Sequence, residues 1–263
     1  MNYKRHWNEK QTITSVYCSE DSGCKSLEVD MIKLSAGESI ALCEIDKEQA
    51  LLILDGTVNV IGDKMNFENI GARKNVFDGK AYAVYVPRNL KFEITAVTDA
   101  RVCISKCPTT EDYEPVLVTP DDIIVKNLGK PGFEREVHLI VDERLQASKI
   151  YVGENYIKGG QWSGYPGHKH DVENLPTEGK AEEIYYYEFD KETGYGVQQV
   201  YTEDRSTDEI YTVRNRDLVE VPYGYHPLAV APGYNGYLLW MMCCESKRAL
   251  VVTLDPEQAW LTK

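Results

Sequence analysis

Short runs of apolar and β-branched residues, separated by Gly, Pro and Asp, recur along the whole chain with little helical periodicity. Between residues 27 and 63 these runs are LEVDMIKLSAG, SIALCEI and ALLILDGTVNVIG. The dipeptide Asp55-Gly56 lies between two of the apolar runs, a pattern that predicts a β-hairpin. The runs KAYAVYVPRNLKFEITAV and ARVCISKC continue the series. Short strands with this punctuation predict an antiparallel β-sandwich or barrel.

The same kind of pattern occurs twice, which predicts two similar domains. Residues 109–122 (TTEDYEPVLVTPDD) are rich in Thr, Pro and acidic residues, and we expect them to connect the two halves. The segment YAVYVPRNLKFEITAV in the first half and DLVEVPYGYHPLAVAP in the second both indicate a strand, a proline turn and a strand. The second copy carries His226 where the first has Lys91 or Phe92, so only the second half is expected to keep a metal site.

The amino-acid composition disfavours some classes of binding partner. The chain of 263 residues has 29 Lys and Arg against 42 Asp and Glu, a net charge of −13, which disfavours nucleic acid and anionic membrane surfaces. No apolar run is long enough to span a bilayer, and the polar start MNYKRHWNEK lacks the apolar core of a signal peptide. Seven cysteines without CxxC spacing favour reduced thiols in a cytoplasm over a disulfide framework.

Three of the five histidines fall in a pattern that predicts a metal site. His168 and His170 form an H-x-H pair, whose side chains share one face of a strand while Lys169 points the other way. A loop (NLPTEGK) separates the pair from the strand-like run EEIYYYEF, which contains Glu183. His226 follows a Pro-x-Gly turn and precedes another apolar run. Three imidazoles and one carboxylate suit a divalent transition metal, and the alternative is an exposed strand with two solvated histidines.

Four segments of the second half resemble a known enzyme family. GGQWSGYPGHKHD, EEIYYYEF, GYGVQQVYT and VPYGYHPLAVAPGY are similar to the motifs of 5-deoxy-glucuronate isomerase of inositol catabolism, in the cupin superfamily. The first motif of that family reads closer to WSSYPPHKHD, so Gly164 and Gly167 replace a Ser and a Pro, and we expect a looser approach loop. In the first half, GARKNVF and YAVYVP look like the family's metal-free domain. The related 4-deoxy-L-threo-5-hexosulose-uronate isomerase of pectin breakdown shares the ligand pattern, but the long insertion between His170 and Glu183 favours the inositol enzyme.

The resemblance implies a fold, a metal and a reaction. The expected fold is all-β, with two double-stranded β-helix (cupin) barrels: a degenerate domain without metal ligands at 1–118 and a metal-binding domain at 119–263. The ion, zinc by similarity to the uronate isomerases, would be held by His168, His170, Glu183 and His226. The aldehyde 5-deoxy-D-glucuronate would become the ketone 5-dehydro-2-deoxy-D-gluconate, which requires a Lewis acid and a group that moves a proton between C1 and C2. A metal-assisted hydride shift is the alternative route.

Few residues near the predicted ligands can move that proton. Tyr185 and Tyr187 share a strand face with Glu183, so they either line the cavity or pack as core aromatics. Glu154, in YVGENY, is a carboxylate on a strand expected to lead to the site. We therefore predict Tyr185, Tyr187 and Glu154 as the catalytic candidates.

The anionic sugar acid, which is the expected small-molecule partner, needs a local cation because the chain as a whole is acidic. Arg135 is the first candidate, since it enters a strand of the metal-bearing half, and Arg73 is the second. Tyr165 precedes the H-x-H pair and Tyr225 adjoins His226, so both are expected to contact substrate. The sequence leaves a homo-oligomer open.

Two other functional classes remain open at this point. A cupin site with three His and one Glu also suits an iron or copper dioxygenase, which would have a mostly apolar pocket, and the tyrosine-rich surroundings speak against it. A non-catalytic sugar-binding or regulatory cupin would be expected to carry a DNA-binding module, and no segment of this sequence reads as a helix-turn-helix.

Overall fold

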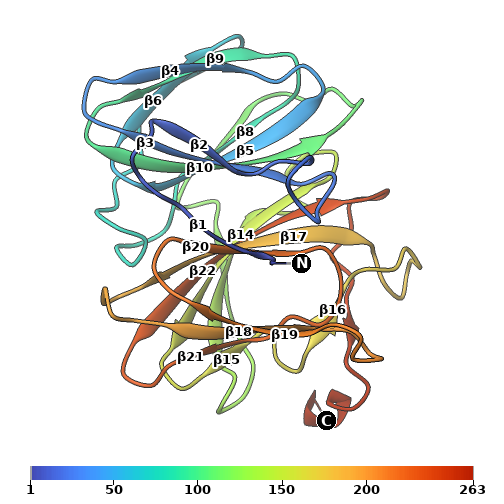
Figure 1. Cartoon of the computed structure of the whole chain (residues 1–263). Helices are drawn as coiled ribbons and strands as arrows, with labels where there is room; N and C mark the ends of the chain where they lie inside the picture. Colours follow the sequence, from blue (N-terminus) through green and yellow to red (C-terminus); the bar gives the residue numbers. More distant parts are fainter. Residues whose placement is uncertain (1, 263) are drawn as a thin grey trace.

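The computed structural model describes residues 2–262 and consists almost entirely of β-strands (Figure 1). In the first half, one sheet of six strands has the order β11-β8-β5-β10-β3-β2. Its strands are β2 (Ile13–Tyr17), β3 (Glu28–Leu34), β5 (Lys47–Asp55), β8 (Ala83–Val86), β10 (Ala100–Pro108) and β11 (Val116–Val118). A four-stranded sheet, in the order β4-β9-β6-β7, faces it. Its strands are β4 (Ser39–Cys43), β6 (Val58–Gly62), β7 (Met65–Ile70) and β9 (Lys91–Ala96).

The second half repeats this plan with a larger sheet of seven strands in the order β1-β20-β17-β22-β14-β13-β12. These are β1 (Lys4–His6), β12 (Ile124–Leu128), β13 (Arg135–Val141), β14 (Ile150–Lys158), β17 (Ala181–Phe189), β20 (Asp217–Val221) and β22 (Asn235–Cys244). The opposing four-stranded sheet comprises β15 (Trp162–Ser163), β18 (Gly196–Tyr201), β19 (Asp208–Val213) and β21 (Leu228–Val230). A two-stranded sheet joins β16 (His168–Lys169) to β23 (Thr253–Leu254), and a 3-10 turn, η1 (Ala259–Thr262), follows.

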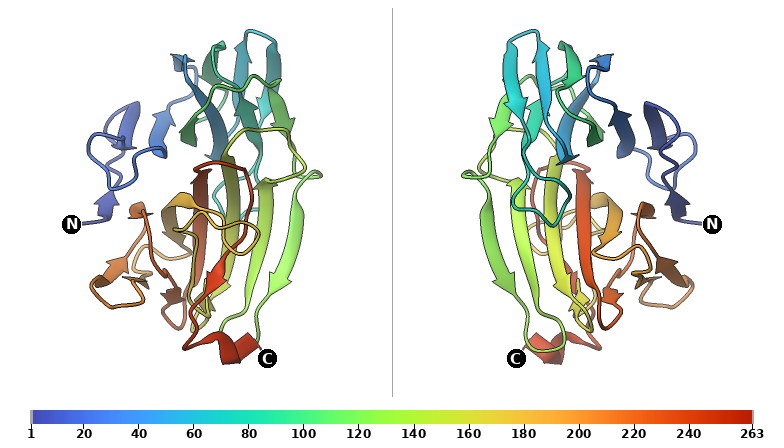
Figure 2. Two further views of the ribbon diagram at one scale, coloured as in Figure 1. Left: turned by 90° about the vertical axis from the view of Figure 1, so that its right-hand side faces the viewer. Right: turned by 90° about the vertical axis from the view of Figure 1, so that its left-hand side faces the viewer.

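The two halves lie one above the other (Figure 2), and their largest sheets pack against each other. An apolar layer that includes Met31 and Leu52 from the first half and Ile184 and Leu239 from the second fills the space between these sheets. The first residues of the chain cross to the second half, where β1 pairs with β20. All other strands of residues 13–118 pair among themselves. The all-β prediction is therefore confirmed, while the expected division into domains at residue 118 stays a prediction.

Each half also encloses its own core, and the two cores differ. The first half is filled by aliphatic side chains, Met65 and Phe92. In the second half, alternation along β17 turns Tyr185 and Tyr187 inward, while Ile184 faces the layer between the two halves. The inward face of β17 is the one that carries Glu183, as the sequence predicted.

The hairpin predicted at Asp55-Gly56 is wrong. Strand β5 ends at Asp55 and pairs with β8 and β10, whereas β6 pairs with β7 and β9 in the opposing sheet. Gly56 has a φ of 80°, and a Cβ there would lie 2.2 Å from the backbone oxygen of Asp99. The turn signal is thus real, but it marks a crossing between sheets, which the local sequence does not distinguish from a hairpin.

Two further features bear on the sequence predictions. Among residues 2–262, no helix has the length and apolar character needed to cross a membrane. All seven cysteines are free thiols, and five of them are buried, as small apolar side chains would be.

Candidate metal centre

The H-x-H segment and the strand β17 are joined as the sequence predicted. The backbone N–H of Ala181 donates to the carbonyl of His170 at 2.9 Å, which closes the loop between them. His170 lies on the same side as His168, and Lys169 points away to bind Asp171 and Glu178 at 2.5 and 2.9 Å. His226 lies just before β21, after a turn in which Gly224 has a φ of 85°. Three separate segments of the chain thus meet at one end of the second half.

The ligand atoms of His168, His170 and His226 lie within 4.8 Å of one another. The rings of His168 and His226 have centroids 4.8 Å apart, and those of His170 and His226 5.0 Å. Glu183 Oε2 lies 3.0 Å from His170 Nε2 and 3.1 Å from His226 Nε2. Three of these four groups are buried, and His168 is half-buried. The set combines three nitrogen donors and one oxygen donor, as the sequence predicted for a divalent metal.

Hydrogen bonds to backbone carbonyls show that this set fits a cation. His170 Nδ1 donates to the carbonyl of Ala181 at 2.8 Å, and His226 Nδ1 donates to that of Gly224 at 2.8 Å. A carbonyl only accepts, so the proton of each neutral ring resides on Nδ1 and both Nε2 lone pairs face the Glu183 carboxylate. His226 Nε2 is buried without a hydrogen-bond donor or acceptor of suitable geometry. Three acceptors that face one another need a positive charge between them, which either a metal ion or a proton provides.

The pKa shifts of the cluster have the same origin. Burial alone would raise the pKa of Glu183, but His170 and His226 outweigh it and hold the pKa well below its usual range. Burial would lower the pKa of His170, but contact with Glu183 raises it, so without a metal a proton is favoured there. Burial and the two other imidazoles lower the pKa of His168 well below its ordinary value. His168 is therefore neutral at pH 7 and able to donate a lone pair.

These groups lie in a cavity of about 600 Å³ inside the second half. Much of its wall is apolar, with Leu238, Trp240 and Met242 from β22 and further leucine and valine side chains from the C-terminal segment. This corrects the expectation of polar, tyrosine-rich surroundings. The argument from polarity against a dioxygenase therefore does not hold.

Arg135 and Tyr185, two of the polar residues predicted for the site, lie in the wall of the cavity. Arg135 borders the cavity, is half-buried, and forms no ion pair among residues 2–262; its closest polar contact is the carbonyl of Phe133 at 3.5 Å. Burial lowers the pKa of Arg135, because the lost hydration outweighs the opposing effect of Tyr185. Tyr185 also lines the cavity, with its ring 5.7 Å from that of His226. Burial and the Glu183 charge raise the pKa of Tyr185 well above its usual value, so it is a neutral phenol that can donate a proton.

The other tyrosines predicted for the site separate into two groups. Tyr165 lines the cavity, packed against Phe133 and Trp162 at 5.8 and 5.4 Å between ring centroids. Tyr187 is fully buried outside the cavity wall, and its hydroxyl donates to Gln198 at 2.9 Å. Tyr225 is also buried away from the wall and packs on the ring of Tyr201. Neither of these two tyrosines lines the cavity.

Glu154 does not reach the metal centre, contrary to the sequence expectation. It is fully buried on the opposite face of β14, where it forms an ion pair with Arg73 at 2.7 Å and accepts from the hydroxyl of Tyr237 at 2.8 Å. Arg73, the second candidate for the substrate carboxylate, is occupied by this contact and is buried between the two halves. The neighbouring Asn155 takes the position facing the cavity and accepts a hydrogen bond from Trp240 at 3.0 Å.

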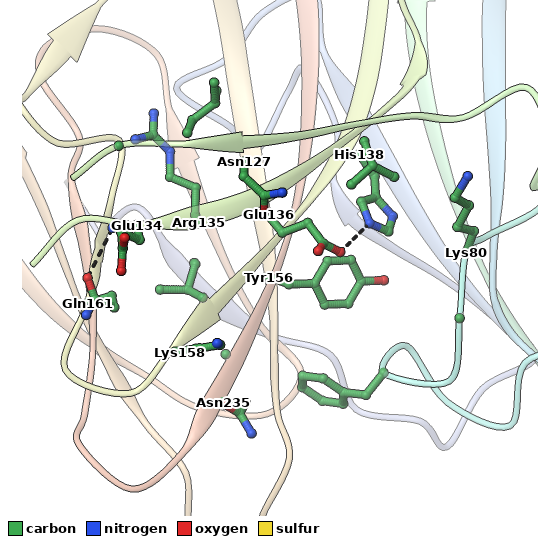
Figure 3. A pocket seen from close by; sticks show the side chains of 17 residues that line it. Lys80, Asn127, Glu134, Arg135, Glu136, His138, Tyr156, Lys158, Gln161 and Asn235 are labelled. Carbon is green, nitrogen blue, oxygen red and sulfur yellow. Dashed lines mark hydrogen bonds and ion pairs between the residues drawn. The ribbon is translucent and has the colours of Figure 1, made fainter. Parts of the chain in front are cut away.

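A larger hollow of about 990 Å³ lies outside the second half, beside β12, β13 and β14 (Figure 3). Glu136 and His138 line it and bind each other at 2.8 Å, while Val137 between them faces the metal cavity. Lys80 on its rim donates to two backbone carbonyls. Among residues 2–262 no cluster of three metal-ligating side chains gathers there. The inner cavity is therefore the better candidate for chemistry.

Comparison with solved structures identifies the fold. The crystal structure of an IolB-like protein from Salmonella typhimurium LT2 has a TM-score of 0.96 and 33% identity, with 100% of both chains covered. A mutant of oxalate decarboxylase from Bacillus subtilis has a TM-score of 0.67 and 13% identity, covering 96% of this chain and 79% of that one, which shows a likeness in fold alone. The chain is thus an all-β protein of the cupin type with a histidine cluster suited to metal.

Sequence comparison identifies the family. The profile of the KduI/IolB family matches residues 2–261. The 5-deoxy-glucuronate isomerase of Geobacillus thermodenitrificans is 37% identical over 97% of this chain and 92% of its own length. The enzyme of the same name from Bacillus licheniformis is 38% identical over 92% of this chain and 89% of its own length. The chain belongs to the KduI/IolB family.

Proposed function

We propose that this protein is an aldose–ketose isomerase that converts 5-deoxy-D-glucuronate into 5-dehydro-2-deoxy-D-gluconate in the inositol catabolism of the cytoplasm. The observation that carries the proposal is the cluster of three imidazoles and Glu183 facing a cavity bordered by Arg135, which forms no ion pair within residues 2–262. The curated relatives named 5-deoxy-glucuronate isomerase support the choice of reaction. We also propose that residues 1–118 form a degenerate first domain without metal ligands and that residues 119–263 form the metal-binding second domain.

The proposed metal ligands are His168, His170, Glu183 and His226, and zinc is the proposed ion. When bound, a divalent ion supplies a Lewis acid that polarises a substrate carbonyl. Arg135 binds the substrate carboxylate, because a half-buried guanidinium that has no carboxylate partner in the described part of the chain gains most from an anion. Tyr185 delivers a proton to a substrate oxygen as a neutral phenol. The apolar wall with Trp240 excludes water from the reacting atoms.

The reaction is balanced without a co-reactant. The C2–H bond breaks and a C1–H bond forms, while the hydroxyl proton on the C2 oxygen is lost and one is gained on the C1 oxygen. No electron acceptor is consumed, so the purified protein loaded with metal should turn over 5-deoxy-D-glucuronate equally fast with and without air. The measurement is product formation by NMR under both conditions, with the pectin-derived uronate assayed in parallel. Strict dependence on O2 would refute the isomerase and favour the dioxygenase, and preference for the second uronate would reassign the substrate.

Replacing Arg135 with alanine should raise KM for the sugar acid by about 10- to 100-fold, since a hydrogen bond to a charged group contributes about 1.5–3 kcal/mol. Arg135→Lys should recover only part of the loss, because the ammonium cannot grip both carboxylate oxygens. Steady-state kinetics of both variants provide the measurement. Arg88→Ala is the control, because Arg88 pairs with Asp112 in the first half. A wild-type KM in Arg135→Ala would remove Arg135 from the substrate site.

A further inference from the structure

The segment that follows β22 returns over the end of the second half where the histidines lie. In Figure 1 this segment runs down beside β16 to the C-terminal turn. Strand β23 pairs with β16, with His168 opposite Leu254 and Lys169 opposite Thr253. Leu250, Val252 and Leu254 contribute to the cavity wall. The C-terminal segment therefore packs directly against the backbone that carries His168.

Tyr201, at the end of β18, binds this C-terminal segment through its hydroxyl group. Its side chain is 1% exposed, and its hydroxyl donates to Asp255 Oδ2 at 2.6 Å and accepts from Gln258 Nε2 at 3.0 Å. Burial and the contact with Asp255 raise the pKa of Tyr201 well above its usual value, so the hydroxyl keeps its proton. The guanidinium of Arg205 lies over the ring of Tyr201, 4.0 Å from its centroid. The hydroxyl is thus saturated by the C-terminal segment and does not face the cavity.

The same segment holds Gly167, the residue before His168, by both its backbone groups. The N–H of Gly167 donates to Gln258 Oε1 at 2.8 Å, and its carbonyl accepts from the N–H of Asp255 at 2.7 Å. A Cβ at position 167 would lie 2.5 Å from the hydroxyl oxygen of Tyr201. A glycine here admits the tyrosine and offers an N–H that proline lacks, so it allows both hydrogen bonds to the C-terminal segment, while the expected loosening of the loop stays a prediction.

The backbone of Tyr201 reaches the other ligand segment. Tyr201 and Tyr225 exchange two backbone hydrogen bonds, of 2.8 and 2.7 Å, and their ring centroids are 5.1 Å apart. Tyr225 directly precedes His226. One residue thus contacts the loop of His226 through its backbone and the loop of His168 through its hydroxyl, Asp255 and Gln258.

We propose that Tyr201 is a positioning residue of the metal centre: with Asp255 and Gln258 it holds the His168 and His226 segments at the separation that lets both imidazoles reach one ion. The proposal rests on the metal site of the proposed function and goes beyond it, because these three residues contact neither metal nor substrate. Residues behind the ligands orient them, and their loss commonly weakens metal binding by about 10- to 100-fold.

The test is the Zn²⁺ dissociation constant of the full-length protein, measured by competition with a chromophoric chelator, together with the melting temperature of the metal-free form. Tyr201→Phe should raise the dissociation constant at least about tenfold. The control is Tyr85→Phe, because the buried Tyr85 hydroxyl donates to Glu48 at 2.7 Å and Tyr85 lies on β8 of the first half, outside the cavity wall. The control should lower the melting temperature and leave Zn²⁺ affinity unchanged. Equal Zn²⁺ affinity in Tyr201→Phe and wild type would overturn the proposal.

A double-variant cycle separates positioning from general destabilisation. Gly167→Ala should weaken Zn²⁺ binding in the wild-type background, because its Cβ displaces the Tyr201 hydroxyl. In the Tyr201→Phe background the same change should have little further effect, since the nearest remaining ring atom, Cζ, lies 3.4 Å from that Cβ. Losses that simply multiply would contradict the coupling. Failure of the wild-type protein itself to bind one equivalent of Zn²⁺ would instead refute the metal site of the proposed function.

Discussion

Replacing His168 and His170 together with alanine should abolish stoichiometric metal binding and lower kcat/KM by about 10³-fold or more. The double variant removes two of the three imidazoles of the cluster and leaves His226 and Glu183 to face each other alone. Polarisation of a carbonyl by a metal is worth several kcal/mol, and about 1.4 kcal/mol corresponds to a factor of ten in rate. Elemental analysis after dialysis and the isomerase assay measure the two effects.

His138→Ala is the matched control for this variant. His138 is a buried histidine of the same half, but it binds Glu136 beside the outer hollow and does not line the metal cavity. Its replacement should cost stability through the lost contact and leave the metal content at one equivalent. Retention of a full equivalent of metal and of activity by the His168/His170 double variant would show that the ligand assignment is wrong.

The ligand cluster could be anticipated because each part of it follows from local rules. Alternation along a strand places His168 and His170 on one side and Lys169 on the other, and the same rule selects the face of β17 that carries Glu183. A Pro-x-Gly turn ends β20 and presents His226. Each of these patterns lies within a short stretch of sequence, so it can be recognised without knowledge of the tertiary fold.

The sequence did not indicate which side chains of β14 face the cavity. Residues 150–154 of this strand are all buried, because one side contacts the first half and the other faces the interior of the second. The strand therefore lacks the polar and apolar alternation that would assign Glu154 to one side. A shift of one residue exchanges the faces, and Asn155 rather than Glu154 faces the metal cavity. For the same reason, the sequence did not indicate that Glu154 pairs with Arg73.

The cavity wall was missed because its residues come from distant segments. Trp240 and Met242 lie on β22, and Leu254 follows much later in the C-terminal segment. In the sequence, each of these residues has the pattern of an ordinary core position. They reach the site only because β22 pairs with β14 and β17, and β23 pairs with β16. Long-range pairings of this kind leave no local signal in the sequence.

Tyr185→Phe should lower kcat by about 10²-fold and leave metal content unchanged, since proton transfer by a positioned side chain contributes about 10²–10⁴-fold. Tyr185 lines the cavity next to His226, and its raised pKa keeps it protonated at the start of the reaction. The measurement is steady-state kinetics of the metal-loaded variant. Tyr187→Phe is the control from the same strand face, because the Tyr187 hydroxyl donates to Gln198 outside the cavity wall. An equal loss of kcat in both variants would argue that the strand, and not the Tyr185 hydroxyl, carries the effect.

The route of the hydrogen between C1 and C2 is decided by isotopic labelling of the same reaction. Substrate that carries deuterium at C2 should lose part of its label to ordinary water, because a proton handled by protein groups exchanges with solvent before it returns to C1. Tyr185→Phe should then slow product formation without restoring the label. Complete retention of deuterium at C1 would refute a transfer through protein groups that exchange with solvent, as a hydride shift predicts, and Tyr185 would in that case move only the proton between the two substrate oxygens. Either result leaves the roles of His168, His170, Glu183 and His226 to be judged by metal content alone.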